Sequence, residues 1–167
     1  GSWIELQVSK LSQRNYDGKY VLELAEILVF RGQENIALNA KVTTSKPGNN
    51  VAARNPQNLT DGQLPYEMKS NRGTSQNLAC YGVPNKGEDC EFTIDLGAAH
   101  TIDQIHLHAV ETSDTIPQTQ PDGLGIPRHF EIIGSLSEDF ASSETIWNYK
   151  KESPFNIGSM LQKQVGG

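Results

Sequence analysis

The sequence predicts an all-β domain. Apolar residues alternate with polar ones over much of the chain, as Ile4, Leu6 and Val8 do near the N-terminus, and a period of two places such residues on one face of a strand. No window of eleven or more residues carries the apolar stripe of an amphipathic helix. The length of 167 residues suits one domain with a full hydrophobic core. We therefore expect a single domain built mainly of strands.

The alternation places the expected strands in chain order. They cover residues 4–9, 20–30, 35–44, 92–96, 102–109, 130–135 and 144–149. A turn at Asp17-Gly18 separates the first two strands. In the second, the apolar parity changes at Ala25-Glu26, which indicates either burial on both faces or a β-bulge that re-aims Glu26. The tail from Lys150 is polar and weakly patterned.

The strand 102–109 carries two histidines on one face. Its odd-numbered apolar residues point to one side, and Gln104, His106 and His108 point to the other. We expect these histidines on the solvent face. Recognition of sugar hydroxyls is an alternative role. Half of a transition-metal site is another, although no third ligand lies at a familiar spacing.

Two long irregular stretches, 45–91 and 111–127, interrupt the strands. Connections of this length inside a compact domain are usually functional or disordered. Cys80 and Cys90 both lie in the first stretch, where a disulfide would close a loop of about ten residues and stabilise the fold by about 2–3 kcal/mol. The alternative is a pair of unbridged thiols. A disulfide would favour an oxidising compartment.

The charge balance excludes some classes of partner. A formal net charge of −6 argues against nucleic acid and anionic membrane surfaces, which attract clustered Lys and Arg. No run approaches the roughly 20 apolar residues of a membrane span, so no membrane insertion is expected. Gly1-Ser2 resembles a remnant of tag cleavage, and a native signal peptide need not be visible in such a sequence.

Enzyme signatures are missing from the sequence. It contains no GxSxG elbow, no P-loop and no dinucleotide-binding fingerprint. The carboxylates are numerous enough that a glycosidase-like pair remains open. We expect a protein without catalytic activity.

Four segments follow one another over about one hundred residues: 35–45 (NIALNAKVTTS), 58–62 (NLTDG), 92–105 (FTIDLG, then TIDQI) and 127–140 (PRHFEIIGS, then EDF). In this order they resemble the landmarks of discoidin domains, also called coagulation factor 5/8 type C domains. That family includes the family 32 carbohydrate-binding modules. The resemblance implies a galactose-binding-like jelly-roll β-sandwich.

The order of the segments departs from the family pattern at the ends of the chain. The family's closing strands would follow Gly167, yet segments of their kind stand at 3–9 and 22–30. One hypothesis is a circularly permuted order, in which 3–30 close the domain whose main body is 35–167. The alternative is that 3–30 end a preceding domain. We favour the first because an unpaired sheet edge beside an exposed core is unfavourable.

The resemblance also implies a structural calcium site. Such domains often hold Ca²⁺ with an Asp and carbonyls of a turn and with a Glu of a closing strand. In this chain the matching residues are Asp61 and Asn58, in the NLTDG segment, and Glu26. Oxygen-rich, irregular sites suit Ca²⁺. The alternative is an ordinary turn at Asp61 with Glu26 facing solvent.

Family members bind ligands with loops at one end of the sandwich. A sugar site needs aromatic rings for the pyranose face and planar polar groups for its hydroxyls. The candidates are Tyr66, Arg72, Tyr81, His108, Glu111 and Arg128. Trp147, next to Ile146 on an expected strand, is instead expected to pack in the core or to cover a sheet face.

The sequence thus predicts a glycan-binding module without catalytic activity. We expect it to be part of a larger exported protein, extracellular or periplasmic, and to act by tethering that protein near its substrate. A structural or protein-interaction sandwich without a sugar site is the alternative. Phospholipid binding is disfavoured because the long loops are polar.

Overall fold

The computed structural model describes residues 2–10, 12–13, 20–21, 24–44, 56–62, 90–109, 126–152 and 160–165. Its elements are β1 (Trp3–Lys10), β2 (Ser12–Gln13), β3 (Tyr20–Val21), β4 (Leu24–Arg31), β5 (Glu34–Asn35), β6 (Lys41–Thr43), the 3₁₀ turn η2 (Pro56–Thr60), β7 (Cys90–Asp95), β8 (Gln104–Ala109), β9 (His129–Ser135), β10 (Ser143–Lys150) and β11 (Met160–Gln164). These ranges contain no α-helix, and the predicted all-β fold is confirmed.

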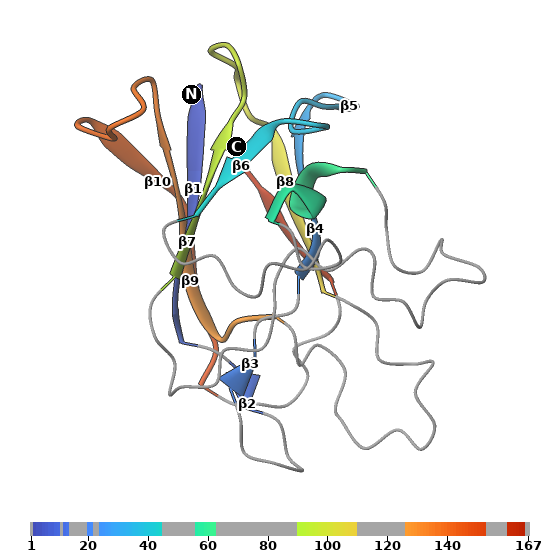
Figure 1. The fold of residues 1–167 in the computed structure, drawn as a ribbon, viewed down its shortest axis with the longest axis vertical. Helices are drawn as coiled ribbons and strands as arrows, with labels where there is room; N and C mark the ends of the chain where they lie inside the picture. Colours follow the sequence, from blue (N-terminus) through green and yellow to red (C-terminus); the bar gives the residue numbers. More distant parts are fainter. Residues whose placement is uncertain are drawn as a thin grey trace.

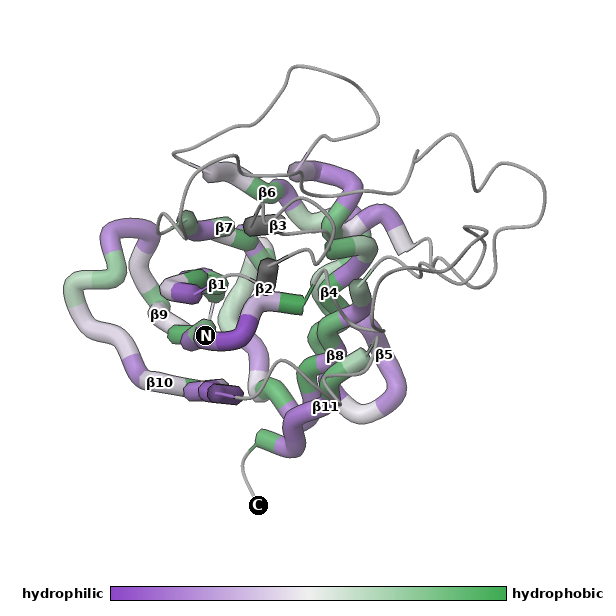
Figure 2. The backbone as a smooth tube through the Cα atoms, turned by 90° about the horizontal axis from the view of Figure 1, so that it is seen from below, coloured by the Kyte–Doolittle hydropathy of each residue, from purple (hydrophilic) through white to green (hydrophobic). Residues whose placement is uncertain are grey.

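Two antiparallel sheets form a sandwich. The first has the strand order β10-β9-β1-β7-β6 and the second β11-β8-β4-β5, while β2 and β3 form a small separate ladder. Figures 1 and 2 show the two sheets as facing layers. This arrangement is consistent with the predicted jelly roll. No helix in the described ranges has the length and apolar character needed to cross a membrane.

The N-terminal segment supplies the middle strand of the larger sheet. β1 pairs with β7 on one side and with β9 on the other. Its apolar residues Ile4, Leu6 and Val8 are all buried. β4 lies in the second sheet, between β8 and β5. The N-terminal segment therefore contributes one strand to each sheet, and the circularly permuted order stays a prediction.

The core consists of the inward-facing residues of both sheets. Leu6, Ile132 and Trp147 are register partners across three strands of the first sheet and are all buried. The Phe130 ring stacks on Tyr149 at 4.9 Å between centroids and meets Trp147 edge-on at 5.0 Å. The expectation that Trp147 packs in the core is confirmed. Such aromatic pairs add to the stabilisation that burial alone provides.

The parity change in β4 is a β-bulge. The register with β8 shifts between Leu24 and Glu26, and the residues from Leu24 to Ile27 are fully buried. The sequence left a choice between burial on both faces and a bulge, and the structure has both. The bulge sets the direction of the Glu26 side chain.

The prediction of one strand over 35–44 is wrong. A turn separates β5 from β6, and Asn39 in it has φ 60°, a left-handed conformation that Asn tolerates better than most residues. The Asn35 side chain explains the turn, because its Oδ1 accepts hydrogen bonds from the backbone N–H groups of Val29 and Ala37, each at 3.1 Å. A side chain that bonds to nearby backbone competes with a continuing strand.

The weakly patterned tail after Lys150 contains a strand, β11. β11 lies at the edge of the second sheet and pairs only with β8. Most of its side chains are exposed, and Leu161 alone packs against the core. An edge strand with one apolar anchor has no alternation for a sequence pattern to detect.

The strand register defines two ends of the sandwich. We name the first the Lys10 end. In the larger sheet, β1 and β10 end there and β7 and β9 begin there. In the smaller sheet, β8 ends there, next to the first residues of β4 and β11. At the opposite end, the Trp3 end, the short described connection 96–103 joins β7 to β8. The Lys10 end is the lower one in Figure 1.

Candidate functional site

Five of the residues predicted for the site or the disulfide lie outside the described residues. They are Tyr66, Arg72, Tyr81, Glu111 and Cys80. Cys90 is the first residue of β7 and is buried. The Cys80–Cys90 disulfide stays a prediction.

The two long segments expected to carry the ligand site join the sandwich at the same end. Residues 63–89 run into Cys90, and residues 110–125 follow Ala109. Cys90 is the register partner of Val8 near the end of β1, and Ala109 is the partner of Leu24 at the start of β4. Both connections therefore attach at the Lys10 end. Loops held by a rigid scaffold are where binding residues concentrate.

Arg128 lies at the Lys10 end and is held there by backbone contacts. Its N–H donates to the Lys10 carbonyl at 2.8 Å, and its own carbonyl accepts from the Lys151 N–H at 2.9 Å. Its Nε donates to the Lys151 carbonyl at 3.0 Å. The Nη atoms form no hydrogen bond with a described residue. One edge of the guanidinium is thus anchored, and the other can receive an acceptor.

Glu26 is the most unusual polar residue of the described structure. Its side chain is fully buried, and its Oε2 accepts a 2.6 Å hydrogen bond from the Gly62 N–H. Burial raises its pKa from 4.5 to about 9; the Gly62 bond opposes this shift, and the adjacent Asp61 carboxyl adds to it. The alternative in which Glu26 faces solvent is wrong.

The NLTDG turn is shaped to meet Glu26. Gly62 has φ +83°, and a Cβ there would lie 2.7 Å from Cδ1 of Leu38. The positive φ is the reason that glycine is favoured at this position. The Asp61 N–H donates to the Asn58 carbonyl at 3.5 Å, so the turn is closed on itself. The predicted partners Asp61 and Glu26 are brought together.

The residues fit a cation in one specific respect. The second carboxylate oxygen of Glu26, Oε1, is buried and has no hydrogen-bond partner among the described residues. A buried oxygen without a partner is costly, and a bound cation would remove that cost. Within the described part of the chain, no group of three or more His, Cys, Asp and Glu side chains could hold a metal. A calcium ion here would need backbone carbonyls or other oxygens to complete its shell.

The expectation that both histidines of β8 face solvent is wrong for His108. Only 3% of its surface is exposed, and burial, together with the nearby His106, lowers its pKa to about 4. His106 is partly buried against Phe30, with ring centroids 4.9 Å apart, and burial lowers its pKa as well. His108 is therefore placed as a packed neutral side chain and not as an exposed ligand-binding one.

Sequence reasoning missed a group of basic residues at the Lys10 end. Lys10 lies near the N-terminus, whereas Lys150 and Lys151 begin the weakly patterned tail. Pairing of β1, β9 and β10 brings all three to Arg128. No spacing in the sequence indicates this. Only the strand register could have revealed it.

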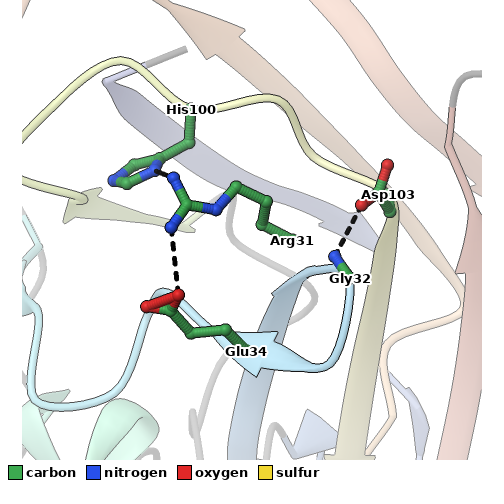
Figure 3. A network of polar contacts seen from close by, with 5 residues as sticks. All are labelled: Arg31, Gly32, Glu34, His100 and Asp103. Carbon is green, nitrogen blue, oxygen red and sulfur yellow. Dashed lines mark hydrogen bonds and ion pairs between the residues drawn. The ribbon is translucent and has the colours of Figure 1, made fainter.

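The charged residues at the Trp3 end are arranged differently. Arg31 donates to Glu34 Oε2 at 3.0 Å and lies 3.1 Å from His100 Nδ1 (Figure 3). Asp103 Oδ2 accepts from the Gly32 N–H at 2.6 Å (Figure 3). These contacts tie the β4–β5 turn to the segment before β8 and pair a positive charge with a negative one. This network therefore has a structural role.

The chain has no match among protein-family models, curated proteins or solved structures. The resemblance to discoidin domains therefore depends on the sequence motifs alone.

Proposed function

We propose that this chain is a non-catalytic carbohydrate-binding module of a larger exported protein. The observation that carries the proposal is the attachment of both long connections to one end of a rigid sandwich, beside Arg128. A module of this kind raises the effective concentration of a neighbouring domain at its substrate without chemistry of its own.

The proposed contacts divide by chemistry. Tyr66 and Tyr81 would cover the apolar face of a pyranose ring. Arg72, Glu111 and Arg128 would bind its hydroxyls through planar donors and acceptors. Arg128 is supported by its geometry, because a backbone carbonyl already holds its Nε and leaves the Nη atoms for a ligand.

Calcium is proposed as a structural ion next to this site. Asp61, Glu26 and the carbonyls of the Asn58–Gly62 turn would hold it, and the buried Glu26 Oε1 supports the assignment. The ion would neutralise two adjacent carboxyl groups and fix the turn from which the segment 63–89 departs. It would take no part in ligand chemistry.

A glycan array tests the proposed function directly. The wild-type chain is expected to retain a defined subset of glycans, and the triple variant Tyr66→Ala, Tyr81→Ala, Arg128→Ala is expected to lose them. Arg31→Ala, which removes an arginine at the Trp3 end, is the matched control and should bind as wild type. Undiminished binding by the triple variant would show that other residues form the site. Silence of the wild type on the whole array would reject the carbohydrate proposal in favour of a structural or protein-interaction domain.

The absence of catalysis has its own test. The isolated chain is expected to release no chromophore from a panel of aryl glycosides. Turnover that disappears with a single carboxylate-to-amide substitution would contradict the non-catalytic assignment.

A further inference from the structure

Basic residues gather at one end of the described structure, on a chain with 14 Lys and Arg residues against 20 Asp and Glu, a net charge of −6. Among the described residues, Lys10, Arg128, Lys150 and Lys151 lie at the Lys10 end; we name them the basic cluster. A locally positive potential on a chain of negative net charge favours an anionic ligand at this end.

The register places part of the cluster in a row. Lys10 and Lys150 are the partners of His129 on either side, so the three side chains lie on one face of the sheet. Strands are about 4.8 Å apart, so the row spans about 10 Å. β10 is the edge strand of the sheet. The row therefore runs to an edge, where an extended ligand can enter.

Among the described residues, Glu152 is the carboxylate that pairs with the cluster. Glu152 lies with its Oε1 3.0 Å from His129 Nε2 and its Oε2 3.8 Å from Lys10 Nζ. Its side chain is 77% exposed. Lys150 and Lys151 form no ion pair with a described residue. Glu152 shows that a carboxylate fits between Lys10 and His129.

Planar polar side chains follow on the same face. Glu131 and Asn148 lie two residues further along β9 and β10, a separation of about 7 Å. Gln7, the β1 partner of Glu131, lies three residues before Lys10 because of the bulge between Val8 and Lys10. All three are at least partly exposed. Amide and carboxylate groups of this kind bind hydroxyls. A charged row beside a hydroxyl-binding row suits a polysaccharide that carries anionic groups better than a lipid surface, which would need exposed apolar contacts.

We propose that the Lys10 end binds an anionic glycan, with the basic cluster contacting its carboxylate or sulfate groups. This inference rests on the proposed carbohydrate-binding function and names the ligand class of that site. Arg128 is oriented to receive two acceptor oxygens through its Nη atoms, the geometry in which arginine binds carboxylate and sulfate best. The lysine ammonium groups attract anions without requiring a particular geometry.

Binding to matched pairs of polymers tests the inference. The first pair is dextran sulfate and dextran, and the second is polygalacturonate and its methyl ester. We expect retention of the charged member of at least one pair and none of its neutral partner, with weaker binding as ionic strength rises to about 0.15 M. The two pairs distinguish sulfate from carboxylate as the recognised group.

Charge variants locate the site. Lys150→Gln with Lys151→Gln should weaken binding roughly three- to tenfold, because exposed charge pairs contribute modestly. Glu152→Gln should strengthen it roughly twofold to fivefold, since it removes the competing carboxylate. The control Lys41→Gln with Lys163→Gln makes the same change in net charge on exposed strand residues away from the Lys10 end. Its binding should stay within about twofold of wild type.

Three results would overturn the inference. One is equal loss in the control double variant, which would indicate non-specific polyanion attraction. Another is binding to phosphatidylserine vesicles, but not phosphatidylcholine vesicles, with no retention of either charged polymer. The third is a set of neutral glycan hits on the array that Lys150→Gln with Lys151→Gln leaves unchanged; this would leave the proposed function standing and remove the anionic ligand alone.

Discussion

At the scale of single residues, the molecule keeps two ionisable side chains in its interior next to each other. Glu26 of β4 and His108 of β8 are register partners, and both are buried. Burial disfavours the charged form of each, so it raises the pKa of the acid and lowers that of the base. Each therefore makes the free energy of unfolding depend on pH, which a wholly apolar core would not do.

Calcium should stabilise the fold through Glu26. At a hundredfold excess of Ca²⁺ over its Kd, binding to the folded state adds about 2.7 kcal/mol, which corresponds to a rise in Tm of roughly 5–10 °C for a chain of this size. Glu26→Gln should remove the rise while changing the calcium-free Tm little, because the pKa of about 9 keeps Glu26 protonated at neutral pH. Thermal melts with calcium and with chelator measure both quantities.

The control for this experiment is Glu34→Gln. Its carboxylate is 63% exposed and pairs with Arg31 at the opposite end of the sandwich. Its calcium response should equal that of the wild type. Identical melts of the wild-type chain in calcium and in chelator would contradict the calcium site.

His108 should make the fold sensitive to acid. Its folded pKa of about 4 lies below the ordinary value of 6.5, so the unfolded chain binds the extra proton first as the pH falls. Stability from this group is complete above about pH 6.5 and falls by up to about 3 kcal/mol by about pH 4. Glu26 has the opposite slope between about pH 4.5 and 9, because its folded pKa is raised.

Comparison with His108→Asn isolates the histidine, because Glu26 and His106 are present in both proteins. In calcium-free buffer, the unfolding free energy of the wild type relative to the variant should decline as pH falls through this window. Chemical denaturation at several pH values measures the difference. Parallel pH profiles of the two proteins would contradict the prediction.

At the scale of elements, a strand's contribution follows its place in the sheet more closely than its sequence does. β1 lies between two partners and has buried residues at alternate positions. β11 has one partner and one packed apolar residue. Removing the same atoms from each strand should therefore have different costs.

Leu6→Ala and Leu161→Ala test this contrast. Leu6 is 1% exposed in the middle of the core, so truncation should cost about 2–5 kcal/mol. Leu161 is half-buried at a sheet edge, and its truncation should cost about 1 kcal/mol or less. Urea denaturation with a shared m-value gives both numbers. Similar costs at the two positions would mean that β11 is integrated more deeply than its exposure indicates.

The same difference explains which elements the sequence could predict. β1, β7, β8 and β9 were predicted because each buries alternate residues on one sheet face. β10 was also predicted, although Trp147 is its one buried residue. The β4 bulge was visible as a change of parity. The turn after Asn35 was not visible in the sequence, because it depends on a side-chain contact with β4. β11 was not visible either, because a single packed apolar residue gives no alternation. The basic cluster has no local signal because it exists only through pairing of distant strands.

At the scale of the whole molecule, the two ends of the sandwich differ in their polar contacts. Contacts between strands distant in the sequence hold the core together, and the Trp3 end is tied by the Arg31–Glu34 ion pair and the Gly32–Asp103 hydrogen bond. The basic cluster lies at the Lys10 end, where the two long segments attach. In the proposed function, this cluster attracts an anionic partner to that end.

The interleaving of early and late strands predicts a single cooperative unfolding transition. Trp3 stands at the start of β1, and Trp147 is buried in β10, with β9 between the two strands. Trp3→Phe leaves fluorescence that reports on β10, and Trp147→Phe leaves fluorescence that reports on β1. Neither strand can leave the sheet without breaking the pairing of β9 on one side. Within each variant, the fluorescence midpoint should therefore coincide with the midpoint from far-UV circular dichroism. A Trp3 signal that changes well before the circular dichroism of the same protein would mean that the N-terminal segment unfolds apart from the sandwich, and the central position of β1 would then contribute little to its stability.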